Sequence, residues 1–584
     1  MTAPNVNTLW GRALVDELAK AGVETVVAAP GSRSTPLTVA AARNDDLEVV
    51  SLLDERSAAF FALGRAKRTG QPTPLICTSG TAAAEFHPAV IEADRSRTPM
   101  LLLTADRPPE LADSGANQTV DQSRLYGDAV RYHRTLPEPA AADRTLRSLR
   151  TTVCRAVGES VGAAAGPVHL NVPFAKPLEP TAVPGSVPDT FAAEHPLAAN
   201  GRDGPFVAVH PGQPTAAPGT VSAISDAVDA AERGLIVAGP SGPEGLSGSA
   251  GAELAEATGF PVLADPLSGL RFGPHVSEMT VCGGYDAYLD TPASEPLDPD
   301  LVLRFGASPT SKPLRQFLSS SAARQVVVDP AGGWREASFT AGELVESDPT
   351  AFAEALVGEL DGPPADPDWR ARFEAAEAAH WELLEEASDL FEGAVAARVA
   401  AGAPDPATLY ASSSMPVRDL DRFGAPDAAE LTVLGSRGAS GIDGITSAAV
   451  GAGSAVDEPL VLLIGDLAFY HDLTGLLALE RAGVDATIVL VNNDGGGIFH
   501  QLPIAAFDPP FTALFETPHG LDFGHAADLF GLEHSRVETL DGFEAAYADS
   551  LAVEGSQLVE VRTDAEASFA VRDRLQDALV ERLT

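Results

Sequence analysis

Short apolar runs alternate with helical patterns along most of this chain. Near the N-terminus, an apolar run over residues 23–28 precedes a helical pattern from Ser34, and a run over 47–53 precedes a helical pattern over 55–68. Further along, the pattern predicts single helices over residues 81–93 and 369–392, the second strongly acidic and expected to be solvated, and apolar runs predict strands over 262–264 and 301–305. Runs of this length separated by helices are typical of parallel strands that are buried on both faces of a sheet. The sequence therefore predicts an α/β fold made of doubly wound parallel sheets.

Two polar segments divide this pattern. Residues 177–204 are rich in proline, alanine, glycine and aspartate and are typical of a linker, and residues 361–367 form a second break. A chain of 584 residues is also too long for one hydrophobic core. We therefore predict three α/β domains, over residues 1–180, 200–360 and 370–584.

The charge balance excludes some classes of partner. The chain has 39 basic and 82 acidic residues and a net charge of −43, which would repel nucleic acid. In molar salt the screening length falls to about 3 Å, so we interpret the acidity as adaptation to a salt-rich cytoplasm rather than as an acidic binding surface. The sequence has no secretion signal and no apolar stretch of the ~18 residues that cross a membrane. We predict a soluble, cytoplasmic protein without nucleic-acid or membrane partners.

Two apolar runs in the last third of the chain are each followed by a residue that can bind a cation. The run over 460–464 leads to Asp466, and the run over 488–491 leads to Asn493. The carboxyl ends of parallel strands meet at the same edge of a sheet, so these side chains should lie close together. Gly495 can add a backbone carbonyl, and the glycines that follow it let a phosphate approach closely. This oxygen-ligand set favours a Mg²⁺ site; the alternative is two ordinary strands that end in turn residues.

Glu55 is the acid that we select in the first domain. It follows an apolar strand and precedes the apolar helix over residues 58–63. In such surroundings the pKa of a carboxyl group is raised, and the group can share a proton with a ring nitrogen. The alternative is an acid that is stabilised at a helix N-terminus by the helix dipole.

Four arginines lie beside glycines and turn residues after predicted strands: Arg33, Arg107, Arg418 and Arg437. Together they can bind carboxylates in a bidentate manner. A charge-assisted hydrogen bond contributes about 1.5–3 kcal/mol, so several would select a di- or tricarboxylate over a monoacid. Any one arginine is more commonly a surface residue, but Lys312 is one of only four lysines.

Ordered motifs along the chain resemble those of the thiamine diphosphate (ThDP)-dependent 2-oxoacid decarboxylase group. The similarity is to its menaquinone-biosynthesis branch, whose members make 2-succinyl-5-enolpyruvyl-6-hydroxy-3-cyclohexene-1-carboxylate. The motifs are Pro30–Leu37, Asp54–Phe60, Cys77–Ala84, Leu103–Leu111, Gly115–Gln118, Gly166–Phe174, Ser436–Gly444 and Val491–Phe499. They cover both outer domains almost throughout, whereas the middle domain matches mainly around Lys312.

The resemblance implies a pyrimidine-binding first domain, a central domain and a diphosphate-binding third domain. It implies ThDP and Mg²⁺ (or Mn²⁺) as cofactors, which bind between the first domain of one subunit and the third domain of another, in a homodimer or homotetramer. The reaction that it implies is decarboxylation of 2-oxoglutarate followed by conjugate addition of the succinyl carbanion to isochorismate.

The family's functional positions match residues of this chain. Glu55 matches the cofactor-activating glutamate, Ile442 matches the residue that holds the cofactor bent, and Ile498 with Phe499 would shield the carbanion from water. The implied metal ligands are Asp466, Asn493 and Gly495. The implied cofactor-binding residues are Glu55, Ser79, Ile442, Gly465, Asp466, Leu467, Asn493, Gly495 and Gly496. The implied catalytic and substrate-binding residues are Glu55, Ser32, Arg33, Arg107, Gln118, Lys312, Ser414, Arg418, Arg437, Ile498 and Phe499.

Two positions depart from the family pattern, and two other functions stay open. Leu467 replaces the usual glycine after the metal aspartate, and Pro313 replaces a second basic residue that some relatives carry. One alternative is another ThDP enzyme, such as an acetohydroxyacid synthase or an oxoacid decarboxylase, although its smaller substrates would not need four arginines. The other is a nucleotide-binding or regulatory protein; the glycines of residues 441–444 give only a weak dinucleotide signal.

Overall fold

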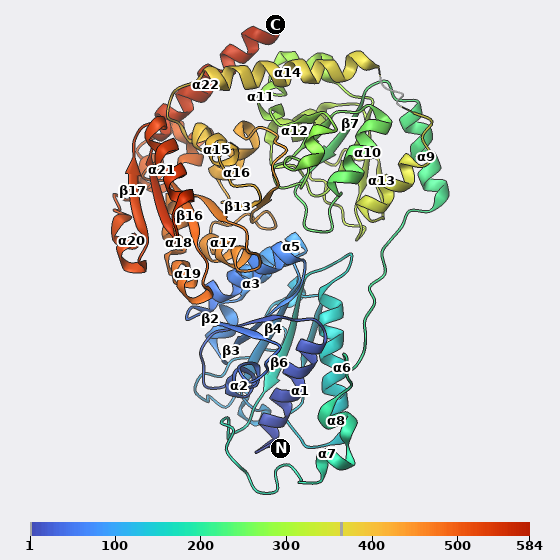
Figure 1. Ribbon diagram of the computed structural model, residues 1–584, viewed down its shortest axis with the longest axis vertical. Helices are drawn as coiled ribbons and strands as arrows, with labels where there is room; N and C mark the ends of the chain where they lie inside the picture. The colour runs from blue at the N-terminus through green and yellow to red at the C-terminus, as the bar shows by residue number, and fades with distance from the viewer. Residues whose placement is uncertain (1–2, 363–365) are drawn as a thin grey trace. The chain divides into compact units, whose positions relative to one another are not determined.

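The computed structural model describes residues 3–362 and 366–584, and within them it contains three six-stranded sheets (Figure 1). Every strand pair in these sheets is parallel. Helices connect the strands, as parallel pairing requires. The predicted α/β fold with doubly wound parallel sheets is therefore confirmed.

The described chain divides into two compact units. The first unit holds the residues up to Gly212 together with Thr446–Val456 and Thr474–Val484, and the second unit holds the rest. The three predicted domain ranges stay a prediction, and residues 363–365 of the predicted second break lie outside the described residues. The predicted linker, residues 177–204, carries two short helices, Phe191–Glu194 (α7) and Pro196–Asn200 (α8).

The first sheet has the strand order β2-β1-β3-β4-β6-β5. Its strands are Thr25–Ala28 (β1), Glu48–Ser51 (β2), Thr73–Cys77 (β3), Met100–Asp106 (β4), Tyr132–Thr135 (β5) and Pro167–Pro173 (β6). Its helices are Val6–Lys20 (α1), Thr35–Ala41 (α2), Glu55–Thr69 (α3), Thr81–Ala84 (α4), His87–Ser96 (α5) and Asp143–Ser160 (α6).

Both faces of this sheet are covered. Val26 and Ala28 belong to one core with residues of α1, α2 and α6, while Val27, which points to the opposite face, is also fully buried. Helix α3 packs with α5, and α1 packs with α2 and α6. The single helix predicted over residues 81–93 is wrong: α4 ends at Ala84, and α5 starts anew with Pro88 in its first turn, where the missing amide hydrogen is tolerated.

The second unit contains the other two sheets. Their strands are Gly234–Ala238 (β7), Val262–Ala264 (β8), Val281–Cys282 (β9), Leu301–Phe305 (β10), Arg324–Val328 (β11), Glu343–Val345 (β12), Ala407–Ala411 (β13), Leu431–Leu434 (β14), Leu460–Gly465 (β15), Ala486–Asn492 (β16), Glu533–Val537 (β17) and Gln557–Arg562 (β18). The helices that carry the argument below are Tyr285–Tyr288 (α11), Lys312–Ser320 (α12), Pro367–Glu386 (α14), Glu392–Ala401 (α15), Met415–Phe423 (α16), Asp466–His471 (α18) and Ala565–Leu583 (α22). The remaining helices of this unit are Pro218–Asp229 (α9), Gly248–Thr258 (α10), Pro349–Val357 (α13), Gly524–Phe530 (α20) and Leu540–Ala552 (α21).

The central sheet, β12-β11-β10-β7-β8-β9, has the strand order of dinucleotide-binding folds. Its ligand crevice would lie where β7 and β10 diverge. There a Cβ on Gly239 would lie 1.7 Å from the carbonyl oxygen of Ala307, so the chain's own backbone fills this point.

The single helix predicted over residues 369–392 is two helices, α14 and α15. Trp369 of α14 donates to the Gly234 carbonyl (2.8 Å) in the core of the central sheet.

Within the first unit, α3 lies against Ile445–Gly453 (α17) without room for a methyl group. A Cβ on Gly64 would lie 1.8 Å from the carbonyl oxygen of Ala448, and a Cβ on Gly451 would lie 1.9 Å from that of Phe61. The two glycines therefore let the two helix backbones touch.

We expect Gly64→Ala to lower the free energy of unfolding by about 1–3 kcal/mol or more, because the helices must separate to admit the methyl group. The matched control is Gly219→Ala in α9, where nothing lies within 4 Å of an added Cβ; alanine should be neutral or stabilising there. Thermal unfolding in molar KCl measures both variants, and an unchanged or higher midpoint for Gly64→Ala would contradict the tight contact.

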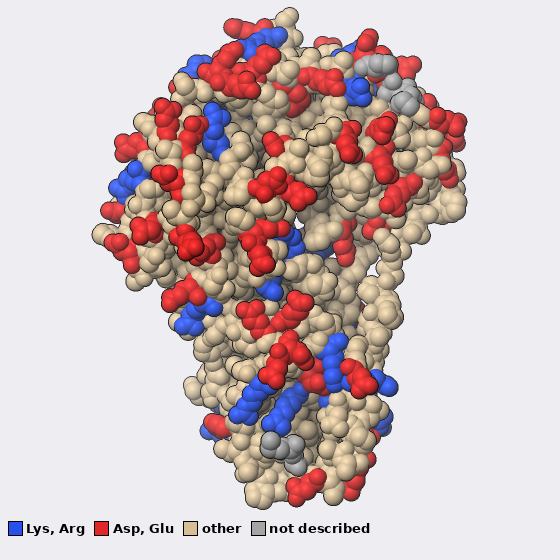
Figure 2. Space-filling model, in the orientation of Figure 1, with Lys and Arg blue, Asp and Glu red and all other residues tan. Residues whose placement is uncertain are grey.

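Acidic side chains are spread over the visible face of the molecule, and basic side chains are far fewer there (Figure 2). This distribution agrees with the net charge of −43. In the described part of the chain, no helix has both the length and the apolar character needed to cross a bilayer. All three cysteines are buried and free.

Candidate active site

The first and third sheets each have a point at which the chain connections after two adjacent strands run in opposite directions. In the first sheet the connections after β1 and β3 diverge, and in the third sheet, β14-β13-β15-β16-β18-β17, the connections after β13 and β15 diverge. Ligands of open α/β sheets bind outside the carboxyl ends of the strands at such points. Most of the predicted site residues of each unit follow these strands or their neighbours.

The loops after β1 and β3 are in direct contact in the first unit. A Cβ on Gly31 would lie 2.3 Å from Cβ of Thr78, so only glycine fits there. The Arg33 amide donates to Oγ1 of Thr78 (3.3 Å), and its guanidinium donates to the carbonyl of Phe174 (2.5 Å). Arg33 is thereby held almost completely buried, whereas the adjacent Ser32 is exposed.

Ser79 and Gln118 bind each other through side chain and backbone. Oγ of Ser79 donates to the Gln118 carbonyl, and Nε2 of Gln118 donates to the Ser79 carbonyl, both at 2.9 Å. Gly80 has a φ of +88°, and its amide donates to Oε1 of the buried Gln122 (2.9 Å). The predicted residues Ser79 and Gln118 are therefore brought together at the end of β3.

Arg107 follows β4 beside a held carboxylate. Asp106 accepts the Arg107 amide (2.7 Å) and Nδ2 of Asn171 (2.7 Å). The Arg107 Nε is buried and has no hydrogen-bond partner among the described residues. Burial, followed by the charge of Arg107, lowers the pKa of Arg33, so the two cations lie close together. The pair is suited to bind an anion.

Glu55 begins α3 at the carboxyl end of β2. Asp54, and not Glu55, caps this helix: its side chain accepts the amides of Arg56 (2.9 Å) and Ser57 (3.4 Å). Glu55 is half-buried, and burial is the largest cause that raises its pKa. The sequence prediction of a raised pKa is confirmed. Its charge also contributes to raising the pKa of Cys77, so Glu55 lies near the end of β3.

In the second unit, Asp466 is 3% exposed at the end of β15. Its Oδ1 accepts the Leu467 amide (2.7 Å), and its Oδ2 accepts the Gly495 amide (3.0 Å). His519 Nε2 lies 3.3 Å from the same Oδ2. Burial is the largest cause that raises the pKa of Asp466. The predicted meeting of Asp466 with the segment around Gly495 is present.

Asn493 is fixed by a buried acid. Its Nδ2 donates to Oε1 of Glu392, which is 2% exposed (2.6 Å), so the amide oxygen is turned away from that carboxylate. The glycines that we expected to approach a phosphate approach the chain itself: a Cβ on Gly495 would lie 2.2 Å from the Glu516 carbonyl oxygen, and the Gly496 amide donates to it (2.7 Å).

Arg418 and Arg437 lie on neighbouring turns of the second unit. Ser414, with a φ of +73°, begins α16, and its carbonyl accepts a hydrogen bond from Arg418. Ser413 Oγ donates to the Ser436 carbonyl (2.9 Å), which ties the turn that carries Arg437 to this point. The Nε and Nη1 of Arg437 are buried without hydrogen-bond partners among the described residues.

Ile498 and Phe499 lie in a short 3-10 helix, Gly497–Gln501. Phe499 packs edge-on against Phe515 at 5.6 Å, and Gln501 Nε2 donates to Sδ of Met415 at 3.3 Å. Met415 is next to Ser414, so the predicted apolar wall lies beside the arginine-bearing helix α16.

Three further predicted residues lie on other loops and helix or strand ends of the second unit. Ile442 is half-buried in the loop between β14 and α17, Lys312 is exposed in the first turn of α12, and Gly465 ends β15.

Sequence reasoning missed His519, Glu392 and Gln122. His519 contacts Asp466 and also lies 3.2 Å from Asp494, yet it comes from a segment with no helix or strand pattern. The sequence pattern places Glu392 in a solvated acidic helix, whereas the structure buries it. Gln122 follows no predicted strand. The sequence offers only its position shortly after the motif Gly115–Gln118.

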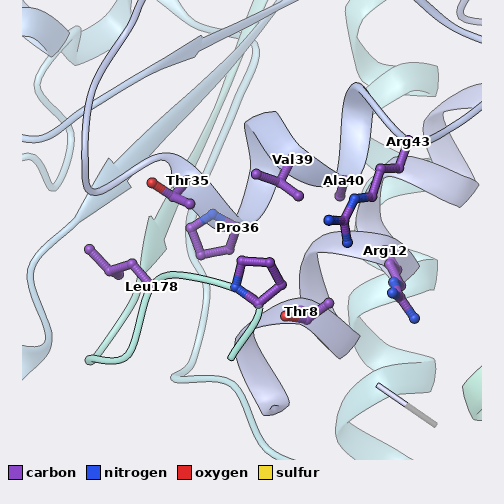
Figure 3. A pocket seen from close by; sticks show the side chains of 9 residues that line it. Thr8, Arg12, Thr35, Pro36, Val39, Ala40, Arg43 and Leu178 are labelled. Atoms are coloured by element: carbon purple, nitrogen blue, oxygen red, sulfur yellow. The ribbon is translucent and has the colours of Figure 1, made fainter. Parts of the chain in front are cut away.

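One pocket of the first unit lies elsewhere. It is lined by Thr8, Arg12, Thr35, Pro36, Val39, Ala40, Arg43, Leu178 and Pro180. Figure 3 shows Arg12 and Arg43 on one side and Leu178 on the other. None of the predicted site residues lines this pocket.

Family models match three stretches of the chain. Residues 10–125 match the N-terminal TPP-binding domain of thiamine pyrophosphate enzymes, residues 220–411 match the middle domain of such enzymes, and residues 427–561 match the C-terminal TPP-binding domain. A solved structure, the ThDP-dependent 4-hydroxybenzoylformate decarboxylase of Rhodococcus jostii RHA1, covers 95% of this chain and 99% of its own, with a TM-score of 0.69 and 21% identity. That likeness supports the fold.

Curated relatives match along the whole length. The 2-succinyl-5-enolpyruvyl-6-hydroxy-3-cyclohexene-1-carboxylate synthase of Natronomonas pharaonis is 61% identical, with 100% of both chains covered. The synthase of Halobacterium salinarum is 60% identical over 99% of both chains, and that of Roseiflexus castenholzii is 45% identical over 98% of this chain and 99% of its own. The chain belongs to the 2-succinyl-5-enolpyruvyl-6-hydroxy-3-cyclohexene-1-carboxylate synthase family of thiamine diphosphate enzymes.

Proposed function

We propose that this chain decarboxylates 2-oxoglutarate and adds the resulting succinyl group to isochorismate, giving 2-succinyl-5-enolpyruvyl-6-hydroxy-3-cyclohexene-1-carboxylate for menaquinone biosynthesis. The observation that carries the proposal is the presence of arginines without carboxylate partners at the strand ends of both units, in a chain that is 60% identical to named synthases over 99% of its length. Both substrates are multiply anionic, and arginine forks bind carboxylates in a bidentate manner.

Glu55 is the residue that we assign to cofactor activation. When bound, thiamine diphosphate supplies the thiazolium ring that stabilises a carbanion. A half-buried carboxyl with a raised pKa keeps its proton closer to neutral pH and can exchange it with a ring nitrogen of the aminopyrimidine. Ser79 and Gln118, which fix each other at the end of β3, belong to the same half of the site.

The diphosphate and its cation are assigned to the second unit. Asp466, Asn493 and the Gly495 carbonyl would hold Mg²⁺ or Mn²⁺, with Gly465, Leu467, Gly496 and Ile442 close to the cofactor. The donors fit a hard divalent cation, because they are a carboxylate, an amide oxygen and a backbone carbonyl. The nearly complete burial of Asp466 supports this fit, since a buried carboxylate needs a compensating positive charge.

Substrate binding is assigned to Ser32, Arg33, Arg107, Lys312, Ser414, Arg418 and Arg437. Arg33 and Arg107 would bind carboxylates from the first unit, and Arg418 and Arg437 from the second. Phe499, packed edge-on against Phe515, and its neighbour Ile498 would exclude water from the reacting carbon.

We further propose that two copies share each site, in a homodimer or homotetramer. Large apolar side chains are exposed close to the assigned residues: Leu53 is 55% exposed beside Glu55, and Phe507 and Leu514 are 62% and 72% exposed in the segment that follows Phe499. Exposed apolar side chains beside the assigned residues support their burial against a second copy. Light scattering in molar KCl should give at least twice the 60.3 kDa of one chain.

An assay tests the activity. The purified protein, with ThDP and Mg²⁺ in molar KCl, should convert 2-oxoglutarate and isochorismate to an adduct that mass analysis identifies, and CO₂ release should depend on isochorismate. CO₂ release from 2-oxoglutarate at the full rate without isochorismate would favour another oxoacid decarboxylase. Formation of acetohydroxy acids from pyruvate would favour an acetohydroxyacid synthase.

A further inference from the structure

Arg315 is a third arginine at the cluster formed by Arg418 and Arg437. It lies in the second turn of α12, whose residues Leu314 and Phe317 are buried. Arg315 follows Lys312 by three residues, so the two cations lie on the same side of the helix. The position directly after Lys312 is Pro313, which carries no charge.

Helix packing brings Arg315 towards the site. Helix α11 contacts both α12 and α16, so it links the helix that carries Arg315 to the helix that carries Arg418. Burial and then the charge of Arg437 lower the pKa of Arg315. Burial, then Arg437 and then Arg315 lower the pKa of Arg418. The three guanidinium groups therefore lie within electrostatic reach of one another.

The positive charges of these three arginines are not neutralised by ion pairs within the described chain. Among the described residues, none of the three forms an ion pair with a carboxylate; Arg315 donates to the Pro309 carbonyl (3.2 Å) and Arg418 to the Ser414 carbonyl. Three acids within electrostatic reach of Arg315 have hydrogen-bond partners of their own, although Oδ2 of Asp421 is buried without one among the described residues. Their partners are Ser311 for Asp286 (2.6 Å), Arg271 and Tyr285 for Asp421 (3.0 and 2.6 Å), and the amide of Thr310 for Asp265 (2.8 Å).

We propose that Arg315 is a substrate-binding residue and that, with Arg418 and Arg437, it binds a carboxylate of a dicarboxylic substrate. Three cations, with two buried guanidinium nitrogens of Arg437 unpaired, match an anion with several oxygen acceptors. This inference rests on the proposed function, and either substrate, 2-oxoglutarate or isochorismate, has the required chemistry.

The test is Arg315→Gln, with KM measured for each substrate while the other is saturating. We expect KM for one of the two to rise about 10- to 100-fold, the value of one charge-assisted hydrogen bond, with kcat changed by less than about threefold. The substrate whose KM rises is the one that Arg315 binds. Arg315→Lys should recover part of the lost substrate affinity, because lysine restores the positive charge but not the bidentate guanidinium group.

The matched control is Arg372→Gln. Arg372 also donates its Nη1 to a proline carbonyl, that of Pro296 (3.1 Å), but it is exposed on α14. KM values of Arg315→Gln within twofold of those of Arg372→Gln for both substrates would overturn the proposal, as would a fall in kcat at constant KM.

A binding measurement separates this inference from the proposed function. Glutarate, a five-carbon dicarboxylate, should raise the thermal unfolding midpoint of the wild-type holoenzyme more than butyrate does, and Arg315→Gln should remove the difference while Arg372→Gln keeps it. That result stands even if the wild-type protein makes no adduct, in which case only the proposed function fails. Equal effects of glutarate and butyrate on the wild type would overturn the assignment of Arg315.

Discussion

Replacing Glu55 by glutamine is expected to lower kcat by about 10²- to 10⁴-fold, the contribution of a positioned acid–base group. Glutamine has nearly the same shape but cannot exchange a proton with a ring nitrogen. ThDP and Mg²⁺ should still bind, because the assigned metal ligands are unchanged. Steady-state assays give kcat, and the rise of the unfolding midpoint with ThDP and Mg²⁺ reports binding.

The same variant has an expected pH signature in stability. The pKa of Glu55 is raised in the folded state, so the folded protein binds this proton more tightly than the unfolded chain does. The wild type therefore loses stability relative to Glu55→Gln as pH rises through 4.5, the unfolded value, and the difference is constant above the folded-state pKa. At neutral pH the variant should unfold at an equal or higher temperature.

The control for this experiment is Glu138→Gln, an exposed acid of the same unit. Its kcat should stay within about twofold of the wild-type value, as for most surface substitutions. A Glu55→Gln enzyme with normal turnover would exclude the proton exchange that we assign to Glu55. A variant that is inactive and also unfolds at a much lower temperature would show a structural role in place of a chemical one.

Replacing Asp466 by asparagine is expected to abolish cofactor binding. Removing a group that only supports a metal ligand costs about 10- to 100-fold in affinity, and a direct carboxylate ligand should cost more. The new amide would also place an N–H group towards the Gly495 amide or the Leu467 amide, both of which donate to Asp466. The rise of the unfolding midpoint with Mg²⁺ and ThDP, which we expect for the wild type, should be lost together with activity.

Asp457→Asn provides the matched control, because Asp457 is exposed and precedes the other end of the same strand, β15. It should keep both the cofactor-induced rise and the activity. If Asp466→Asn responded to Mg²⁺ and ThDP like the wild type, the metal site would have to lie elsewhere.

Much of the fold could be predicted because the inner strands are buried on both faces. Val262–Ala264 and Leu301–Phe305 have the predicted bounds, since each is a continuous apolar run. The edge strands Tyr132–Thr135 and Glu533–Val537 were not predicted. Both are partly exposed and mix polar with apolar residues, so neither has an apolar run that separates it from a loop.

Helix ends were harder to predict where tertiary contacts set them. The helix α14 ends at Glu386 without a glycine or proline after it, so the sequence gives no stop signal before Glu392. The chain turns there, and Glu392 becomes buried against Asn493. An acid that appears solvated in the sequence is therefore part of the candidate site.

The candidate site could be predicted only as far as strand ends determine it. The contact of Asp466 with Gly495 follows from the parallel order of β15 and β16. His519 reaches Asp466 from an irregular segment, and Arg315 reaches its cluster through helix packing. Neither arrangement leaves a periodic pattern in the sequence, so the sequence alone does not predict it.

Counted from the first strand of each, the two outer sheets both follow the order 2-1-3-4-6-5. Their amino-acid sequences show no repeat that can be aligned by eye, so the two sheets share a backbone path and not a set of residues. After the second strand, one sheet carries Glu55 and the other carries Arg437; after the third, one carries Ser79 and the other Asp466. Equivalent strand ends therefore present different chemical groups, and neither sheet presents all of the assigned residues.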